Sequence, residues 1–211
     1  MKPILRFAFR YLLLFLALFV LLTSISLIPK VGAFCNQTFR KPTEPILKAL
    51  LPKAYLQLKA HSDSPDVIRI EYASKQQVDQ QVLAAKSAAQ AITTIQGMEV
   101  TIKFYNTFLG FYIFLVTLFL ISPVPSKQKA INLLIGSIIF YFYKIFRLYL
   151  TLLSTFALPE IGIYHLTDFW NKAVQAMLNF LTMGTDTLVL LVIWAILTFR
   201  GKNWNEILNA K

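Results

Sequence analysis

Cysteine and histidine are almost absent from this 211-residue chain, which contains one cysteine, Cys35, and two histidines, His61 and His165. A single thiol can form neither an internal disulfide nor a thiolate-based zinc cluster. With so few ligating side chains, we expect no metal site and no cofactor. Glycine and proline are also modest, at 7 and 9 residues, and no low-complexity tract or solenoid repeat is visible.

Acidic residues are scarce as well, with 10 of them against 21 basic residues and a formal net charge of +11. In a soluble protein such an excess would suggest a nucleic-acid partner. Base-stacking aromatic residues interleaved with surface cations are not seen, however, so we expect no nucleic-acid binding. The cations instead gather just outside apolar runs, as the positive-inside rule requires; they are Lys2, Arg6, Arg10, Lys127, Lys129, Arg200 and Lys202.

Apolar residues make up 56% of the chain, against about 45–50% in soluble domains. A membrane span needs about 20 apolar residues, and within lipid such runs form helices. We therefore predict an all-α membrane protein with about four transmembrane helices. The predicted spans are Tyr11 to Ile28, Phe104 to Ile121, Ala130 to about Leu158, and Thr187 to Phe199 with a few residues added at its amino end.

The first run follows three cations, as a signal sequence does, but it is longer than a signal core and no clear cleavage site follows it. We interpret it as an uncleaved anchor. Asp186 and Gly184 interrupt the last run, which makes it the weakest span of the four.

Cations in the short loops predict the orientation in the cytoplasmic, or inner, membrane. The amino-terminal ten residues, the turn from Ser122 to Lys129 and the tail after Phe199 are basic, whereas the loop from Ala157 to Thr182 contains only Lys172. Both termini are therefore expected to be cytoplasmic and residues 30–103 extracytoplasmic. The expected parts are an anchor over 1–29, a cap over 30–103 and a three-span membrane domain over 104–211.

The cap is expected to be a small α+β unit. Val67 to Tyr72 alternates as a half-buried strand does, and Tyr55 to Leu58 can pair with it as a hairpin. Lys75 to about Ile95 carries apolar residues at helical spacing. Outside the cap, Trp170 to Leu181 is amphipathic and too polar to span comfortably, so we expect it to lie along the outer interface or to re-enter.

Lys144 and Arg147 lie inside the third apolar run, three residues apart on one helical face. A cation in hydrocarbon costs at least about 2.5–3.5 kcal/mol, so such residues usually face a protein interior and mark function. Arg147 lies roughly 26 Å along the helix from the cytoplasmic turn, at the outer leaflet. The alternative is that both cations extend to the outer interface beside Tyr141, Tyr143 and Tyr149.

Other candidate residues converge on the same outer side. His165 follows the third span, Asn106 and Thr107 begin the second, and Cys35 follows the first. The sequence thus predicts a polar recess centred on Arg147 and His165. Lys144, Asn106 and Thr107 are its further candidate binding residues.

This arrangement resembles the exosortase/archaeosortase family, membrane-embedded cysteine transpeptidase-like enzymes that cleave carboxy-terminal sorting signals at the outer face. The resemblance covers about residues 105–200. Lys144-Ile145-Phe146-Arg147 matches the family's Asn-x-x-Arg in its arginine but has Lys for Asn, and His165 falls where the family's histidine follows. A Pro-x-Pro and basic turn at Pro123 to Lys129 separates the two spans.

The nucleophile is the main departure from the family. Where the family's Cys-Ser-Gly should open the second span, this chain reads Tyr105-Asn106-Thr107. An amide cannot form an acyl-enzyme, and Thr107 has no evident base.

Three hypotheses follow. The first, which we prefer, is a degenerate exosortase-like protein that acts without catalysis, as an accessory or scaffold whose pocket binds a peptide, a lipid or a neighbouring subunit. The second is a cysteine peptidase in which Cys35 is the nucleophile, His165 the base and Arg147 the oxyanion or carboxylate contact. The third is a small subunit of a larger membrane complex, with Lys144 and Arg147 binding lipid headgroups or a partner's acid.

Overall fold

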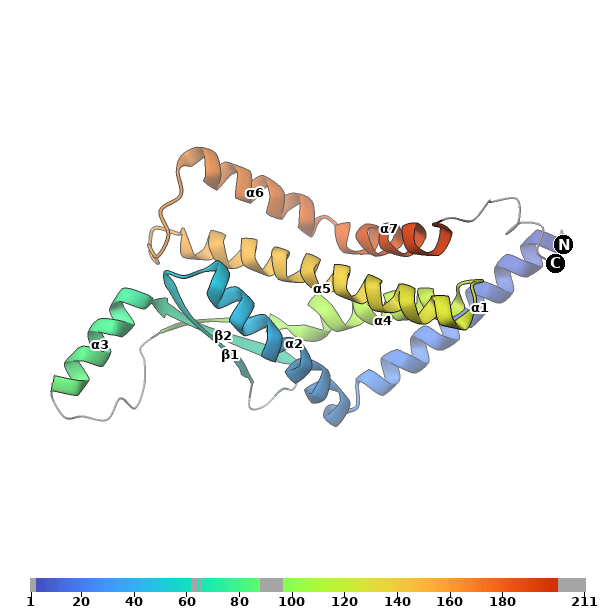
Figure 1. Cartoon of the computed structure of the whole chain (residues 1–211), viewed down its shortest axis with the longest axis horizontal. Helices are drawn as coiled ribbons and strands as arrows, with labels where there is room; N and C mark the ends of the chain where they lie inside the picture. Colours follow the sequence, from blue (N-terminus) through green and yellow to red (C-terminus); the bar gives the residue numbers. More distant parts are fainter. Residues whose placement is uncertain (1–2, 62–63, 65, 88–96, 201–211) are drawn as a thin grey trace.

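The computed structural model describes residues 3–61, 64, 66–87 and 97–200. They form mainly helices, with one small sheet (Figure 1). The helices are α1 Pro3–Ser26, α2 Pro29–Leu50, α3 Lys75–Ser87, the π-helix η1 Tyr105–Leu109, α4 Gly110–Ile121, α5 Ser126–Phe156, α6 Asp168–Thr182 and α7 Thr185–Phe199. The strands are β1 Ala54–Ala60, β2 Val67–Ser74 and β3 Met98–Lys103.

Among the described residues, two helices are long and apolar enough to cross a membrane, namely α1, through Phe9–Ser26, and α5. A third candidate arises if α6 and α7, which meet at an angle of 72°, count as one broken span. Tyr105–Ile121 is apolar but shorter. Two of the four predicted spans therefore meet the length criterion by themselves, and the count of four stays a prediction.

The predicted hairpin is confirmed. β1 pairs antiparallel with β2, and Leu56 lies opposite Tyr72. The predicted helix after it is α3, as far as Ser87; its expected continuation to Ile95 lies outside the described residues. We did not predict β3, which pairs antiparallel with β2 on its other side, because its short alternating run follows a long Gln- and Ala-rich stretch.

We also did not predict α2. Prolines normally break a helix interior because they lack the N–H donor, and α2 contains Pro42 and Pro45. It nevertheless continues, since its buried face packs against β1 and α5. Arg40 on this helix donates to the carbonyl oxygen of Leu58 at 2.9 Å, and the Thr43 hydroxyl lies 3.0 Å from that of Tyr141 on α5.

Two apolar cores result from this packing. One joins the sheet, α2 and the second half of α5. The other joins α4, α5 and α7 around Phe119 and Phe140. At the end of α5 farther from the sheet, Gly136 allows the Phe119 ring to approach closely. Two charged residues of the candidate site, Lys144 and Asp186, are buried together with these apolar cores.

Candidate functional site

One carboxylate, that of Asp186, holds both cations of α5. Its Oδ2 lies 2.9 Å from Nζ of Lys144 and also accepts a hydrogen bond from Nη1 of Arg147. The Tyr143 hydroxyl donates to its Oδ1 at 2.9 Å. The side chains of Lys144, Asp186 and Arg147 are 3%, 8% and 22% exposed, so the cluster is an interior one.

The break between α6 and α7 places this carboxylate. Gly184 has a φ of +77°, a left-handed conformation that glycine adopts without the steric cost of a Cβ. The Thr185 hydroxyl then donates to the Phe180 carbonyl oxygen across the break. Asp186 consequently falls in the first turn of α7, where the helix dipole stabilises a negative charge.

Aromatic rings surround the Lys144 ammonium. Its Nζ lies 4.5 Å from the ring centroid of Phe111, 5.4 Å from that of Phe140 and 5.8 Å from that of Tyr143. A cation over the face of an aromatic ring is stabilised by the ring's quadrupole. Both cations turn to Asp186, which favours the prediction that they face the protein interior over the alternative that they extend away from it beside the tyrosines.

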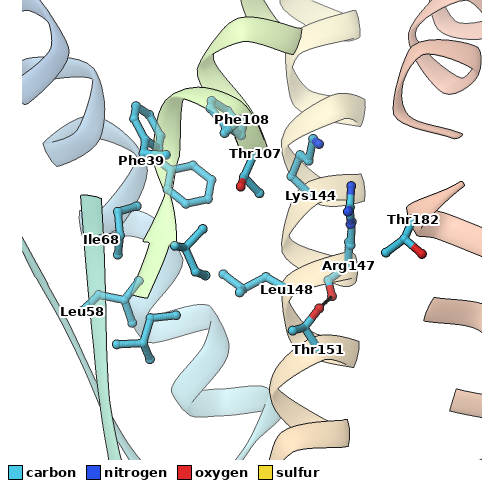
Figure 2. A pocket seen from close by; sticks show the side chains of 13 residues that line it. Phe39, Leu58, Ile68, Thr107, Phe108, Lys144, Arg147, Leu148, Thr151 and Thr182 are labelled. Atoms are coloured by element: carbon cyan, nitrogen blue, oxygen red, sulfur yellow. Dashed lines mark hydrogen bonds between the residues drawn. The ribbon is translucent and has the colours of Figure 1, made fainter. Parts of the chain in front are cut away.

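The two cations also line a cavity of about 280 Å³ between α5 and the sheet. Figure 2 shows Lys144 and Arg147 on the α5 side and Phe39, Leu58 and Ile68 on the opposite side. The other lining residues are Ile70, Ile102, Phe104, Thr107, Phe108, Leu148, Thr151 and Thr182. The cavity is therefore amphiphilic, with a cationic edge and a broad apolar wall.

The start of the second apolar run supplies one predicted residue to this cavity. Thr107 lines it, whereas its neighbour Asn106 is exposed and is not among the lining residues. Both lie on the π-helix η1, a helix type that is often found at functional sites. The π-helix begins at Tyr105, whose backbone N–H donates to Oδ1 of Asp66 at 2.7 Å.

His165 lies elsewhere. It is exposed and lines a separate polar cavity of about 640 Å³, together with Lys53 and Lys75. Arg147 is not among the residues that line this cavity. The predicted recess with both Arg147 and His165 at its centre is therefore not what the structure contains; Asp186 occupies the place beside Arg147 that we had assigned to His165.

Cys35 lines a third cavity, beside Phe39, Phe108 and Tyr141. Along α2, Cys35 lies about 22 Å from Leu50, the last residue of the helix, at 1.5 Å per residue. The cavity of His165 begins just beyond that end, at Pro52. The thiol and the imidazole are thus not brought together, and burial raises the pKa of the Cys35 thiol, opposite to what a reactive thiolate needs.

Within residues 3–61, 64, 66–87 and 97–200, no three His, Cys, Asp or Glu side chains are grouped so that they could hold a metal ion. The chain matches no family model, no curated protein and no solved structure.

Asp186 is a site residue that we did not predict from the sequence. The available signal was that Asp186 is the single acidic residue of the runs 104–158 and 182–199, and therefore the natural partner of their buried cations.

Proposed function

We propose that this chain is an integral membrane protein whose four apolar segments all cross the bilayer, with both termini cytoplasmic. The start of α1, the turn between α4 and α5, and the end of α7 lie at one end of the molecule, and the sheet lies towards the other (Figure 1). The first end carries Arg10, Lys127, Lys129 and Arg200. This clustering of cations supports a cytoplasmic position for that end.

The lengths of the helices support a position of the charge cluster at the outer boundary of the hydrocarbon. Lys144 lies about 27 Å from the start of α5 and Arg147 about 32 Å from it, at 1.5 Å per residue, and the hydrocarbon is about 30 Å thick. Tyr105–Ile121 and α7 are about 25 Å and 22 Å long. These two short helices reach from the cytoplasmic end to the level of the cluster, and local bilayer thinning can accommodate the difference.

Orientation can be tested by labelling single cysteines in a Cys35→Ala background. Lys127→Cys, in the first turn of α5, should react with a membrane-impermeant maleimide only after the cells are permeabilised. Gln77→Cys, on α3, should react in intact cells. Labelling of both positions from the same side would contradict the proposed orientation.

Within this topology, the protein acts as a non-catalytic accessory or scaffold component of an exosortase-like type. The observation that carries this proposal is the amphiphilic cavity, which pairs buried cations with an apolar wall, while Cys35 and His165 line other cavities. Binding of a ligand chain or a partner fits that geometry. A cysteine peptidase mechanism has no support from it, since base catalysis needs the thiol and imidazole within about 3 Å of each other or joined by one water.

A role as a subunit of a larger complex is the second candidate. It is favoured by large exposed apolar side chains on α6, namely Phe169, Trp170, Met177 and Phe180, of which Phe169 and Trp170 contact each other. Isolation of a stoichiometric assembly in mild detergent, lost when Phe169 and Phe180 are both changed to Ser, would support this role over a free-standing accessory protein.

Complementation of a deletion strain separates binding from catalysis. Cys35→Ala and His165→Ala should restore function, whereas Arg147→Ala should not, with protein abundance checked in the membrane fraction. Lys172→Ala, which removes an exposed cation of α6, is the matched control and should complement. Loss of function in Cys35→Ala at normal abundance would overturn the non-catalytic proposal.

A further inference from the structure

The charge cluster is unbalanced. It contains two cations, Lys144 and Arg147, and one carboxylate, Asp186. No other acidic residue occurs in the runs 104–158 and 182–199. An uncompensated charge in a low-dielectric interior is costly, and a second anion at this position would remove that cost.

The hydrogen bonds at the cluster leave donors for such an anion. Asp186 already accepts on both oxygens, with Oδ2 shared by the two cations and Oδ1 taken by Tyr143. Arg147 uses Nη1 for this carboxylate, and its Nε and Nη2 donors have no hydrogen-bond partner among the residues that the structure describes. Arg147 lines the cavity and its side chain is 22% exposed, so the guanidinium is accessible to an anionic group bound there.

The opposite wall of the cavity has a different character. Leu58, Ile68 and Ile70 from the sheet are at most 4% exposed, and with Phe39 and Phe104 they form an apolar surface. The polar lining groups besides the cations are three threonines, Thr107, Thr151 and Thr182. This wall suits a hydrocarbon chain, which needs no hydrogen-bond partners.

We propose that the cavity binds a single-chain amphiphile with an anionic headgroup, such as a carboxylate or phosphate. The headgroup contacts Arg147 and Lys144, and the chain lies against the wall of Phe39, Leu58, Ile68 and Ile70. This inference rests on the proposed binding function and specifies its ligand. A volume of about 280 Å³ is at the lower limit of ligand pockets, which favours one chain over two.

A peptide fits this cavity less well. Each peptide residue brings a backbone N–H and C=O that must be hydrogen-bonded when buried. Three threonine hydroxyls and two partly occupied cations satisfy few such groups. A bound lipid chain leaves none unsatisfied beyond its headgroup.

The test is native mass spectrometry of the full chain in a neutral maltoside detergent, titrated with dodecyl phosphate. Dodecanol and inorganic phosphate are titrated in parallel, to separate the chain from the headgroup. We expect saturable one-to-one binding of dodecyl phosphate, at least about tenfold tighter than that of dodecanol, because charge-assisted hydrogen bonds add affinity of that order. Inorganic phosphate alone should not bind at the same concentrations.

Three variants locate the site. Arg147→Gln should weaken dodecyl phosphate binding about tenfold or more, Leu148→Trp should block it by filling the cavity, and Lys172→Gln, outside the cavity, should leave it unchanged. Arg147→Lys keeps the charge and serves as a second variant if Arg147→Gln does not yield folded protein. Equal weakening by Lys172→Gln would identify a nonspecific cationic surface and overturn the inference.

The outcomes of these experiments also distinguish an error in the proposed ligand class from an error in the proposed binding function. If dodecyl phosphate does not bind while a synthetic peptide with a free carboxylate does, and Arg147→Gln abolishes that binding, the ligand class is wrong and the binding function stands. If neither binds and Arg147→Ala complements the deletion strain, both fail.

Discussion

The carboxylate of Asp186 on α7 lies 2.9 Å from the ammonium of Lys144 on α5. This contact joins two helices that the chain separates by the whole of α6. Since the same Oδ2 also accepts from Arg147, one acidic residue neutralises part of the charge of two basic ones. The stability of the interior therefore depends unequally on the three residues.

Asp186→Asn preserves the shape of the side chain and removes its charge, which leaves two cations without a counter-ion. We expect a loss of unfolding free energy of about 3–5 kcal/mol, the usual cost of removing one partner from a buried ion pair. Thermal unfolding of the purified chain in detergent measures it. The control is Glu99→Gln: Glu99 pairs with Arg69 at 3.3 Å and is 54% exposed, and such surface pairs contribute about 0–1 kcal/mol. Equal shifts in Tm for the two variants would refute this view of the cluster.

Lys144→Met should be less harmful than Asp186→Asn. It leaves a balanced pair of Arg147 and Asp186, and a methionine side chain can pack among the rings of Phe111 and Phe140 that now surround the ammonium. The same unfolding measurement ranks the two variants. If Lys144→Met were the more harmful change, the positive charge of Lys144 would maintain the packing of α5, and neutralisation of the two cations by Asp186 would not.

Gly136→Ala should weaken the packing of α4 on α5. A Cβ at this position would lie 2.7 Å from a ring carbon of Phe119, and that ring is fully buried, so it has little room to move. We expect a cost of about 1–3 kcal/mol, as for other overpacked cores. Gly32→Ala is the matched control, because its nearest contact is 3.4 Å, to the Ser26 carbonyl oxygen, and it should cause no loss of stability.

Cys35 should react slowly with maleimide at neutral pH. Burial raises the pKa of its thiol, so the thiolate fraction at pH 7.5 is below that of an ordinary cysteine and increases only at more alkaline pH. The comparison is with the exposed position of Lys48→Cys in a Cys35→Ala background. We expect slower labelling of Cys35 at pH 7.5 and a smaller difference as the pH rises. Faster labelling of Cys35 at pH 7.5 would instead indicate the lowered pKa of a catalytic thiol.

Hydrophobic periodicity was sufficient to predict the hairpin and α3, because their apolar residues recur at the spacing of a strand or a helix, and the length of its apolar run was sufficient to predict α5. It failed at α2, where Pro42 and Pro45 disfavour a helix locally and long-range packing on β1 and α5 outweighs that local preference. It also failed at β3, whose six residues form a strand because β2 offers a free edge. Contacts of this kind are not visible in a local window.

The candidate site was predicted in part. Lys144 and Arg147 were identified because each is a cation within an apolar run. Burying a cation costs free energy, so such residues usually have a functional or structural role. Their partner was not predicted, because Asp186 and Gly184 were interpreted only as interruptions of a span. The break at Gly184 is what turns Asp186 towards α5, and no pattern in the sequence specifies that direction. His165 follows α5 closely in sequence, but the loop after α5 directs it to another cavity.

The junction between the sheet and the second apolar run has a mechanical consequence. The backbone N–H groups of Phe104 and Tyr105 both donate to Asp66, one to its carbonyl and one to its carboxylate, each at 2.7 Å. β3 ends at Lys103 and η1 begins at Tyr105, so no linker separates strand from helix. We therefore expect that a change in the angle between β3 and η1 would move Thr107, which lines the amphiphilic cavity, and so alter the width of that cavity.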